Sequence, residues 1–580
     1  MRKSLVCVAL MAAAALLMTA QSKKPASMAP AAASGIAISS VVPSDIPGGA
    51  PRATLAAAAK FAWQEFIALN WPAVGNPRDT PNNNMKFGQP GFTGPLVWQT
   101  FRHKVEIFPG QGTPPGYSQG APNYGYDVAP QYIYGTAFPN GQVPPCPGQT
   151  PVSQPAWVNL DENSQIGLDQ MYAGASASSP VPGQEILFLA KANRADYQYV
   201  ASNGWYNGTA PLAATARYVT TNKQDPTPGN SKLVSFRNGT IEIKTAWRRL
   251  TTKEAGNGHF QTGTVRFYET NGSNACYREE VWGMLALHVE QKTPTAPYFI
   301  FATFGQADNM LDPQGNPIED VNGKLLENQT ATPMNPAITS QNAVSANPPT
   351  TSSVQQLSPQ TVTCTPGSSL YYKNTPNPVP PPPAPPTGLP QGQVCIQRRT
   401  HNIPDTIIAA NASAHAAIAA YNQQNGIKSS PWSYYKLVNV QYKPINKPTP
   451  GKDYTGLDAA TYYQANIVVE TDYNLQVFSG HFQQEPPKQG QPANGCTNVV
   501  PDLLITDFNC NGTPFYNVYF NKTQNNMGGC MGCHGNAQVG GSDFSFILSG
   551  GPVTAPEPAG PAGVAAAQKR FAAIFHRQGW

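Results

Sequence analysis

Two cysteines and a histidine near the carboxyl end form the most chemically specific pattern in this chain. The residues read Cys530-Met531-Gly532-Cys533-His534. Cysteines three positions apart fall on one face of a helical turn, so both thiols can reach the two vinyl groups of one porphyrin. The next residue then places an imidazole under the iron. This C-x-x-C-H pattern predicts one covalently bound haem c, attached through Cys530 and Cys533, with His534 as the metal ligand.

Zinc binding and dithiol chemistry are the alternatives for such a cysteine pair. A zinc site needs a second pair of soft ligands at comparable spacing, and the sequence contains no other C-x-x-C and no H-x₃₋₅-H. A thioredoxin-like pair is expected in a βαβ context, which the surrounding Gly- and Asn-rich sequence does not supply. Haem attachment is therefore the favoured interpretation.

The amino-terminal residues are typical of an export signal. Arg2 and Lys3 precede an apolar run over residues 5–17, and Ala20-Gln21-Ser22 offers small residues for cleavage. The run is too short to span a membrane. We therefore expect a signal peptide over residues 1–22 and no transmembrane anchor after its removal. The mature protein is expected in the periplasm or outside the cell, where bacteria attach haem c.

Composition limits the classes of partner. Only 12% of residues are charged, with 59 Pro and 51 Gly, which indicates many turns and long loops. Loss of Arg2 and Lys3 lowers the basic residues from 37 to 35 against 32 acidic ones, a net charge of +3. No cluster of Lys and Arg is visible, so we expect no nucleic-acid partner.

Six further cysteines fit an oxidising compartment. Proximity in sequence favours the pairs Cys364–Cys395 and Cys496–Cys510, which leaves Cys146–Cys276. Buried free thiols are the alternative for some of them. A bridge from Cys364 to Cys395 would close the base of a Pro-rich loop over residues 374–391, which favours polyproline II structure.

The rest of the chain alternates strand signals with turn residues. Helical periodicity is clear in only three places, at 53–70, 407–421 and 564–576. Strands are expected at 185–191, 233–236, 240–247, 280–289, 297–304, 434–442 and 465–470. The expected fold is β-rich α+β, with a large irregular β region and a few helices over 23–520. A short helical segment for haem attachment follows over 521–580, in which residues 544–548 cover an apolar face of the haem or form a short buried strand.

The second axial ligand of the iron stays open at this level. No methionine follows His534, so the frequent downstream Met ligand is missing. The candidates are Met284, His288, His415, His576 or no permanent ligand. Met284 and His288 fall in an apolar stretch that is expected to be a buried strand, in which residues four apart point the same way.

The sequence resembles bacterial exported monohaem c-type cytochromes through Cys530, Cys533 and His534. It is also similar to large cytochrome c family proteins in which a long β-rich region, with segments like residues 63–72, precedes a terminal Cys-Met-Gly-Cys-His-Gly. This resemblance implies covalent haem c and electron transfer.

Three classes of function are consistent with these features. The favoured one is a cytochrome that transfers single electrons between redox partner proteins in the periplasm. The second is a haem-dependent oxidoreductase that uses peroxide or oxygen at an open sixth iron position. The third is a surface-binding scaffold with an accessory haem, suggested by 25 Tyr and 9 Trp. No G-x-S-x-G, H-E-x-x-H or phosphate loop is present.

Overall fold

The computed structural model describes residues 35–163, 184–309, 319–326, 402–445 and 529–559, together with short isolated stretches elsewhere. Several expected features lie outside the described residues: the signal peptide, residues 375–391 of the Pro-rich loop, the strand at 465–470 and most of the helix at 564–576. Within the described part of the chain, no helix is long and apolar enough to cross a membrane.

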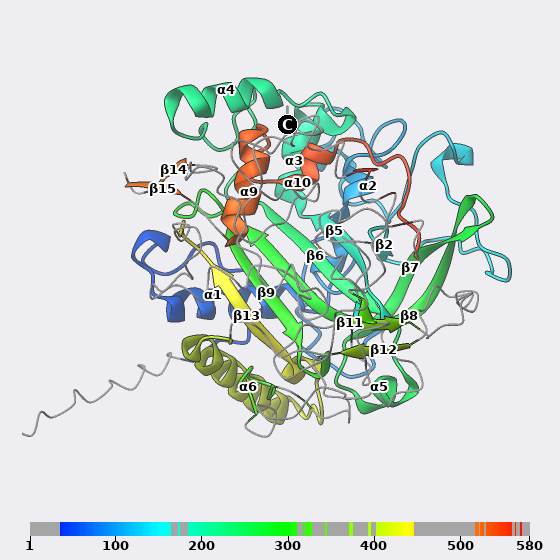
Figure 1. Cartoon of the computed structure of the whole chain (residues 1–580), viewed down its shortest axis with the longest axis vertical. Coiled ribbons are helices and arrows are strands. Elements are labelled where there is room, and N and C mark those ends of the chain that lie inside the picture. The colour runs from blue at the N-terminus through cyan, green and yellow to red at the C-terminus, as the bar shows by residue number, and fades with distance from the viewer. Residues whose placement is uncertain are drawn as a thin grey trace, which may run out of the picture. The chain divides into compact units, whose positions relative to one another are not determined.

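An eight-stranded sheet organises the fold (Figure 1). Its strand order is β1-β5-β6-β8-β7-β2, with β9 paired to β8 and β13 paired to β9. The pairs are antiparallel except β2 with β7. The strands are β1 Arg102–His103, β2 Val158–Leu160, β5 Leu187–Ala192, β6 Ile241–Arg248, β7 Thr262–Asn271, β8 Asn274–Gln291, β9 Ile300–Gln306 and β13 Tyr435–Gln441. The expectation of a β-rich α+β fold is confirmed.

Shorter elements complete the described structure. Three small sheets contain β3 Tyr172–Ala173 with β4 Gln184–Glu185, β10 Ala343–Val344 with β11 Tyr371–Asn374 and β12 Gly392–Cys395, and β14 Asn517–Phe520 with β15 Thr523–Asn526. Two short helices are α2 Lys104–Ile107 and α5 Thr252–Asn257. The 3₁₀ turns are Ala50–Arg52, Trp98–Thr100, Pro122–Gly125, Pro139–Gly141, Trp205–Asn207, Ala307–Asn309 and Pro431–Tyr434.

Two long helices pack on one face of the sheet. Helix α1 (Leu55–Leu69) begins at Thr54, whose side chain caps the N–H of Ala57. Helix α6 (Asp405–Asn425) lies beside it (Figure 1). Asn411 joins both helices to the sheet, because its Oδ1 accepts from the Trp63 indole and from the Leu437 N–H. The apolar residues between these helices and the sheet form the larger hydrophobic core.

Four helices belong to the opposite face. They are α3 Arg194–Ser202, α4 Leu212–Asn222, α9 Gly529–Val539 and α10 Phe546–Gly550, all near the top of Figure 1. A second core cluster combines sheet residues such as Phe301 with Cys530, Met531, Phe544 and Leu548. Residues 530–548 therefore pack against this face of the sheet.

The structure corrects the expected strand at 233–236 and excludes the strand alternative for 544–548. Residues 234–236 are buried, but 233–236 form no strand, because side chains bind their N–H groups: Thr215 Oγ1 accepts from Val234 and the Tyr199 hydroxyl accepts from Ser235. Residues 544–548 are not a strand either. Ser545 caps helix α10 by accepting from the Leu548 N–H.

A β-bulge corrects the expected direction of two side chains. Ala246 pairs with Ala286, whereas the next residue of β6, Trp247, pairs with Met284, so Leu285 is the extra residue of β8. The bulge reverses the alternation. Met284 therefore packs in the core beneath α1 and α6, while His288 lies on the face that carries α9. The expectation that these two side chains point the same way is wrong.

Of the three expected disulfides, one joins side chains that the structure describes. Cys146 and Cys276 form a disulfide, as expected. The side chains of the other two proposed pairs, Cys364–Cys395 and Cys496–Cys510, lie outside the described residues.

Candidate functional site

Helix α9 carries the whole C-x-x-C-H motif. Cys530 is buried in the second core cluster, close to Phe544 and Leu548. The side chain of Cys533 lies outside the described residues. The helix is tied to the sheet near its start, since the Met531 N–H donates to Gln441 Oε1 at 3.1 Å.

A hydrogen bond and two aromatic contacts orient the imidazole of His534. Its Nδ1 lies 2.6 Å from the carbonyl oxygen of Phe544, which can only accept, so Nδ1 carries the proton. Burial lowers the pKa of His534, although Glu290 and the Phe544 carbonyl oppose this effect. Its Nε2 is the ring nitrogen left for another partner. The rings of Phe301 and Phe546, each 4.9 Å from the imidazole, hold its orientation.

The second ring nitrogen of His534 faces a carboxylate. Its Nε2 lies 3.3 Å from Glu290 Oε1, and His288 Nε2 lies 3.3 Å from the same oxygen. Burial raises the pKa of Glu290, but His534, His288 and Lys244 outweigh burial and lower it overall, so this carboxyl is ionised. His534 Nε2 and Glu290 Oε1 thus form an ion pair when the ring is protonated, and a metal bound at Nε2 would take the place of that proton.

Neighbouring carboxyl groups differ from Glu290 in charge. Burial raises the pKa of Asp196 to about 8 and that of Glu242 well above its ordinary value. Both oxygens of Asp196 and one of Glu242 are buried without a hydrogen-bond partner, as expected for protonated groups in apolar surroundings. Asp543 instead pairs with Lys292 at 2.7 Å. Glu290 is therefore the ionised carboxyl that faces His534.

The donor set fits a haem better than a bare metal ion. Over the described ranges, no group of three or more His, Cys, Asp or Glu is arranged to hold a metal ion. Haem iron takes its equatorial ligands from the porphyrin and needs only axial ligands from the protein. A ligating histidine usually donates its other N–H to a carbonyl or carboxylate, as His534 does. The apolar surroundings of Cys530 suit a porphyrin edge.

The four candidates for the second axial ligand lie in different places. Among them, His288 is the one that the described structure brings to His534. Met284 lies on the other face of the sheet. His415 also lies there: its ring packs on Trp63, and both of its nitrogens have partners, at 2.7 Å to Asn322 and 2.8 Å to Tyr435. His576 is outside the described residues.

Sequence reasoning placed Phe544 near the haem but missed Glu290 and the role of the Phe544 carbonyl in this site. The signal for Glu290 was its position two residues after His288, because alternate residues of a strand share a face. Nothing in the sequence indicated that the Phe544 carbonyl would receive the His534 proton. That contact depends on the sharp turn between α9 and α10, in which Asp543 and Phe544 have φ of 53° and 64°.

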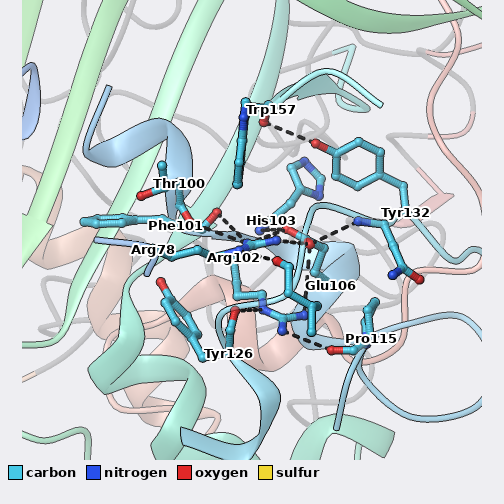
Figure 2. Close-up of polar contacts among 12 residues, drawn as sticks. Arg78, Thr100, Phe101, Arg102, His103, Glu106, Pro115, Tyr126, Tyr132 and Trp157 are labelled. Atoms are coloured by element: carbon cyan, nitrogen blue, oxygen red, sulfur yellow. Dashed lines mark hydrogen bonds and ion pairs between the residues drawn. The ribbon is translucent and has the colours of Figure 1, made fainter. Parts of the chain in front are cut away.

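A separate charged cluster joins a loop residue to strand β1 and helix α2 (Figure 2). Glu106 binds Arg78 through two contacts of 2.8 and 3.1 Å, and Arg102 lies 4.0 Å away. All three side chains are fully buried. Burial raises the pKa of Glu106, but the two guanidinium groups outweigh it and hold the pKa at about 2. This cluster stabilises the fold and presents no accessible group to a ligand.

A cavity of about 280 Å³ lies between a loop and strands β7 and β8. Its lining includes Tyr132, Tyr268, Tyr277 and Arg266. These groups are engaged by the chain: the Tyr132 hydroxyl donates to Ala156, and Arg266 pairs with Glu279 and covers the Tyr277 ring. These groups therefore serve contacts within the chain.

Comparisons of the chain with protein-family models, with curated proteins and with solved structures find no match. A function is consequently inferred from the motif and from the surroundings of His534.

Proposed function

We propose that this protein is an exported c-type cytochrome that carries one covalent haem and transfers single electrons between periplasmic redox partners. Cys530 and Cys533 would hold the haem through thioether bonds, and His534 would be an axial ligand. The bound haem would supply a one-electron iron couple. The carrying observation is that His534 Nδ1–H donates to the Phe544 carbonyl, which leaves Nε2 as the ring nitrogen that a metal could bind.

The chain's own residues prepare this site in three ways. The Phe544 carbonyl selects the tautomer of His534 that can bind a metal. The aromatic rings of Phe301 and Phe546 restrict the rotation of the imidazole. The buried position of Cys530 keeps one attachment point away from water, which lowers the local dielectric and so influences the reduction potential.

Covalent attachment can be tested on denaturing gels. The full-length protein is expressed in a bacterial host with a haem c maturation system, and the purified protein is stained for haem after electrophoresis. We expect a stained band for the wild type and a strong loss of stain for Cys533→Ala and Cys530→Ala. The matched control is the double variant Cys146→Ala/Cys276→Ala, which removes two cysteines elsewhere and should keep its stain.

Absence of haem stain in the wild-type protein would overturn the proposal. Equal staining of the wild type and both single variants would exclude thioether attachment at the motif.

A further inference from the structure

His288 and His534 are held in matching ways on opposing elements. His288 lies on β8 and His534 on α9. Each uses Nδ1 for a short contact with the chain, His534 with the Phe544 carbonyl at 2.6 Å and His288 with Thr303 Oγ1 at 2.7 Å. Each turns its Nε2 toward Glu290. Contacts with the chain thus engage Nδ1 of each ring, and both Nε2 atoms face Glu290 Oε1.

The two Nε2 atoms are close enough for one metal ion to bind both. Each lies 3.3 Å from the same oxygen, Glu290 Oε1, so their separation is at most 3.3 + 3.3 = 6.6 Å. Two metal–imidazole bonds of about 2 Å each require a separation of about 4 Å. The upper bound therefore includes the separation that a shared metal needs.

We propose that His288 is the second axial ligand of the haem iron, opposite His534, an inference that rests on the proposed function. Thr303 is then a positioning residue, because its hydroxyl can accept the Nδ1 proton of His288 and leave Nε2 unprotonated.

Glu290 is the competing side chain on the same face of β8. Carboxylates prefer harder cations such as Mg²⁺ and Ca²⁺, whereas imidazole suits iron and is a regular axial ligand of haem. His288 therefore binds the iron, and Glu290 places a negative charge beside it.

Two histidine ligands would make the iron six-coordinate and low-spin, with no position open to peroxide or oxygen. The inference thus favours electron transfer over the haem-dependent oxidoreductase considered from the sequence. It also explains the missing downstream methionine, since a residue almost 250 positions earlier in the chain takes its place (534 − 288 = 246).

The test uses optical and electron paramagnetic resonance spectra of the haem-loaded full-length protein. The wild type is expected to be low-spin in the ferric state and to bind no carbon monoxide in the ferrous state. In His288→Ala most of the iron should become high-spin, and the ferrous protein should bind carbon monoxide. Added imidazole should restore the low-spin spectrum, which a merely structural role of His288 would not produce.

Two further variants keep the test informative. His288→Met retains side-chain volume and should still change the ferric spectrum if the alanine variant fails to fold. Met284→Leu is the matched control, because it alters the same strand on its other face and should leave the spectrum unchanged.

The outcomes separate the two proposals. A wild-type protein without covalent haem overturns the cytochrome assignment, and this inference with it. A wild-type protein that carries haem but is high-spin overturns the role of His288 alone. So does a low-spin spectrum that persists in both His288 variants.

Discussion

Replacement of Glu106 by Gln should destabilise the fold strongly, because Glu106 neutralises a buried guanidinium pair. Gln keeps the size of the side chain and one acceptor oxygen. Arg78 and Arg102 would then share no buried anion, although backbone carbonyls such as Val128 O still accept from Arg78. The charge of Arg78 would remain buried without compensation.

The magnitude follows from the pKa of Glu106. The folded protein lowers this pKa from 4.5 to about 2, and a difference of that size corresponds to about 3 kcal/mol of favourable interaction with the ionised carboxylate. Loss of one partner from a buried ion pair typically costs about 3–5 kcal/mol. We therefore expect Glu106→Gln to lower the free energy of unfolding by about 3 kcal/mol at pH 7.

The sign of the pH dependence follows from the same values. Because the folded pKa lies below the unfolded one, Glu106 contributes its full stabilisation above pH 4.5. The contribution declines as the pH falls and is lost once the pH passes below about 2. The difference between wild type and Glu106→Gln should accordingly shrink under acid conditions.

Urea unfolding followed by far-ultraviolet circular dichroism at pH 7 and pH 4 measures both effects. Asp127→Asn is the matched control: Asp127 pairs with Arg194, but their side chains are 28% and 24% exposed, so a loss below about 1 kcal/mol is expected. Equal losses for the two variants, or a Glu106→Gln effect that grows toward acid pH, would refute the reasoning.

Two further predictions concern the scaffold. The variant Cys146→Ala/Cys276→Ala opens a link across 130 residues and should lower the free energy of unfolding by about 3–5 kcal/mol, measured by urea unfolding; an unchanged midpoint would contradict it. Asn411→Leu leaves the Trp63 indole and the Leu437 N–H without their acceptor and should cost about 3 kcal/mol or more. Ser413→Ala, at an exposed position of the same helix, is the control in that assay and should change stability little.

Strong local patterns allowed the main elements to be predicted. The expected helix at 53–70 corresponds to α1, and the helix at 407–421 to α6. Expected strands coincide with β5, β6, β9 and β13 within three residues, and the strand expected at 280–289 lies inside the longer β8. These segments combine apolar periodicity with turn residues at their ends, such as the Asn238-Gly239 turn before β6, in which Gly239 has φ of 89°.

Elements that depend on distant partners were not predictable. Helices α3 and α4 are short, and α3 is fixed by tertiary contacts such as the hydrogen bond from the Ser235 N–H to the Tyr199 hydroxyl. The bulge at Leu285 is set by the pairing of β8 with β6 and has no sequence signal of its own. This bulge determines which side chain of β8 reaches the site, because it places His288 rather than Met284 on the face of His534.

The motif itself identified the attachment residues, but the sequence could not indicate what faces them. His288 and Glu290 are more than 240 residues away from His534 in the chain, since 534 − 290 = 244. Their approach depends on the packing of α9 against β8, which no local pattern specifies.

The central claim is tested most directly by mass spectrometry of the peptide that contains both motif cysteines. Trypsin cleavage after Lys522 and Lys569 releases residues 523–569, which include Cys530 and Cys533 and no other cysteine. After maturation in a host that attaches haem c, this peptide should carry the mass of one haem and absorb in the Soret region. A peptide with the bare mass of its amino acids, from protein matured in that host, would contradict the account.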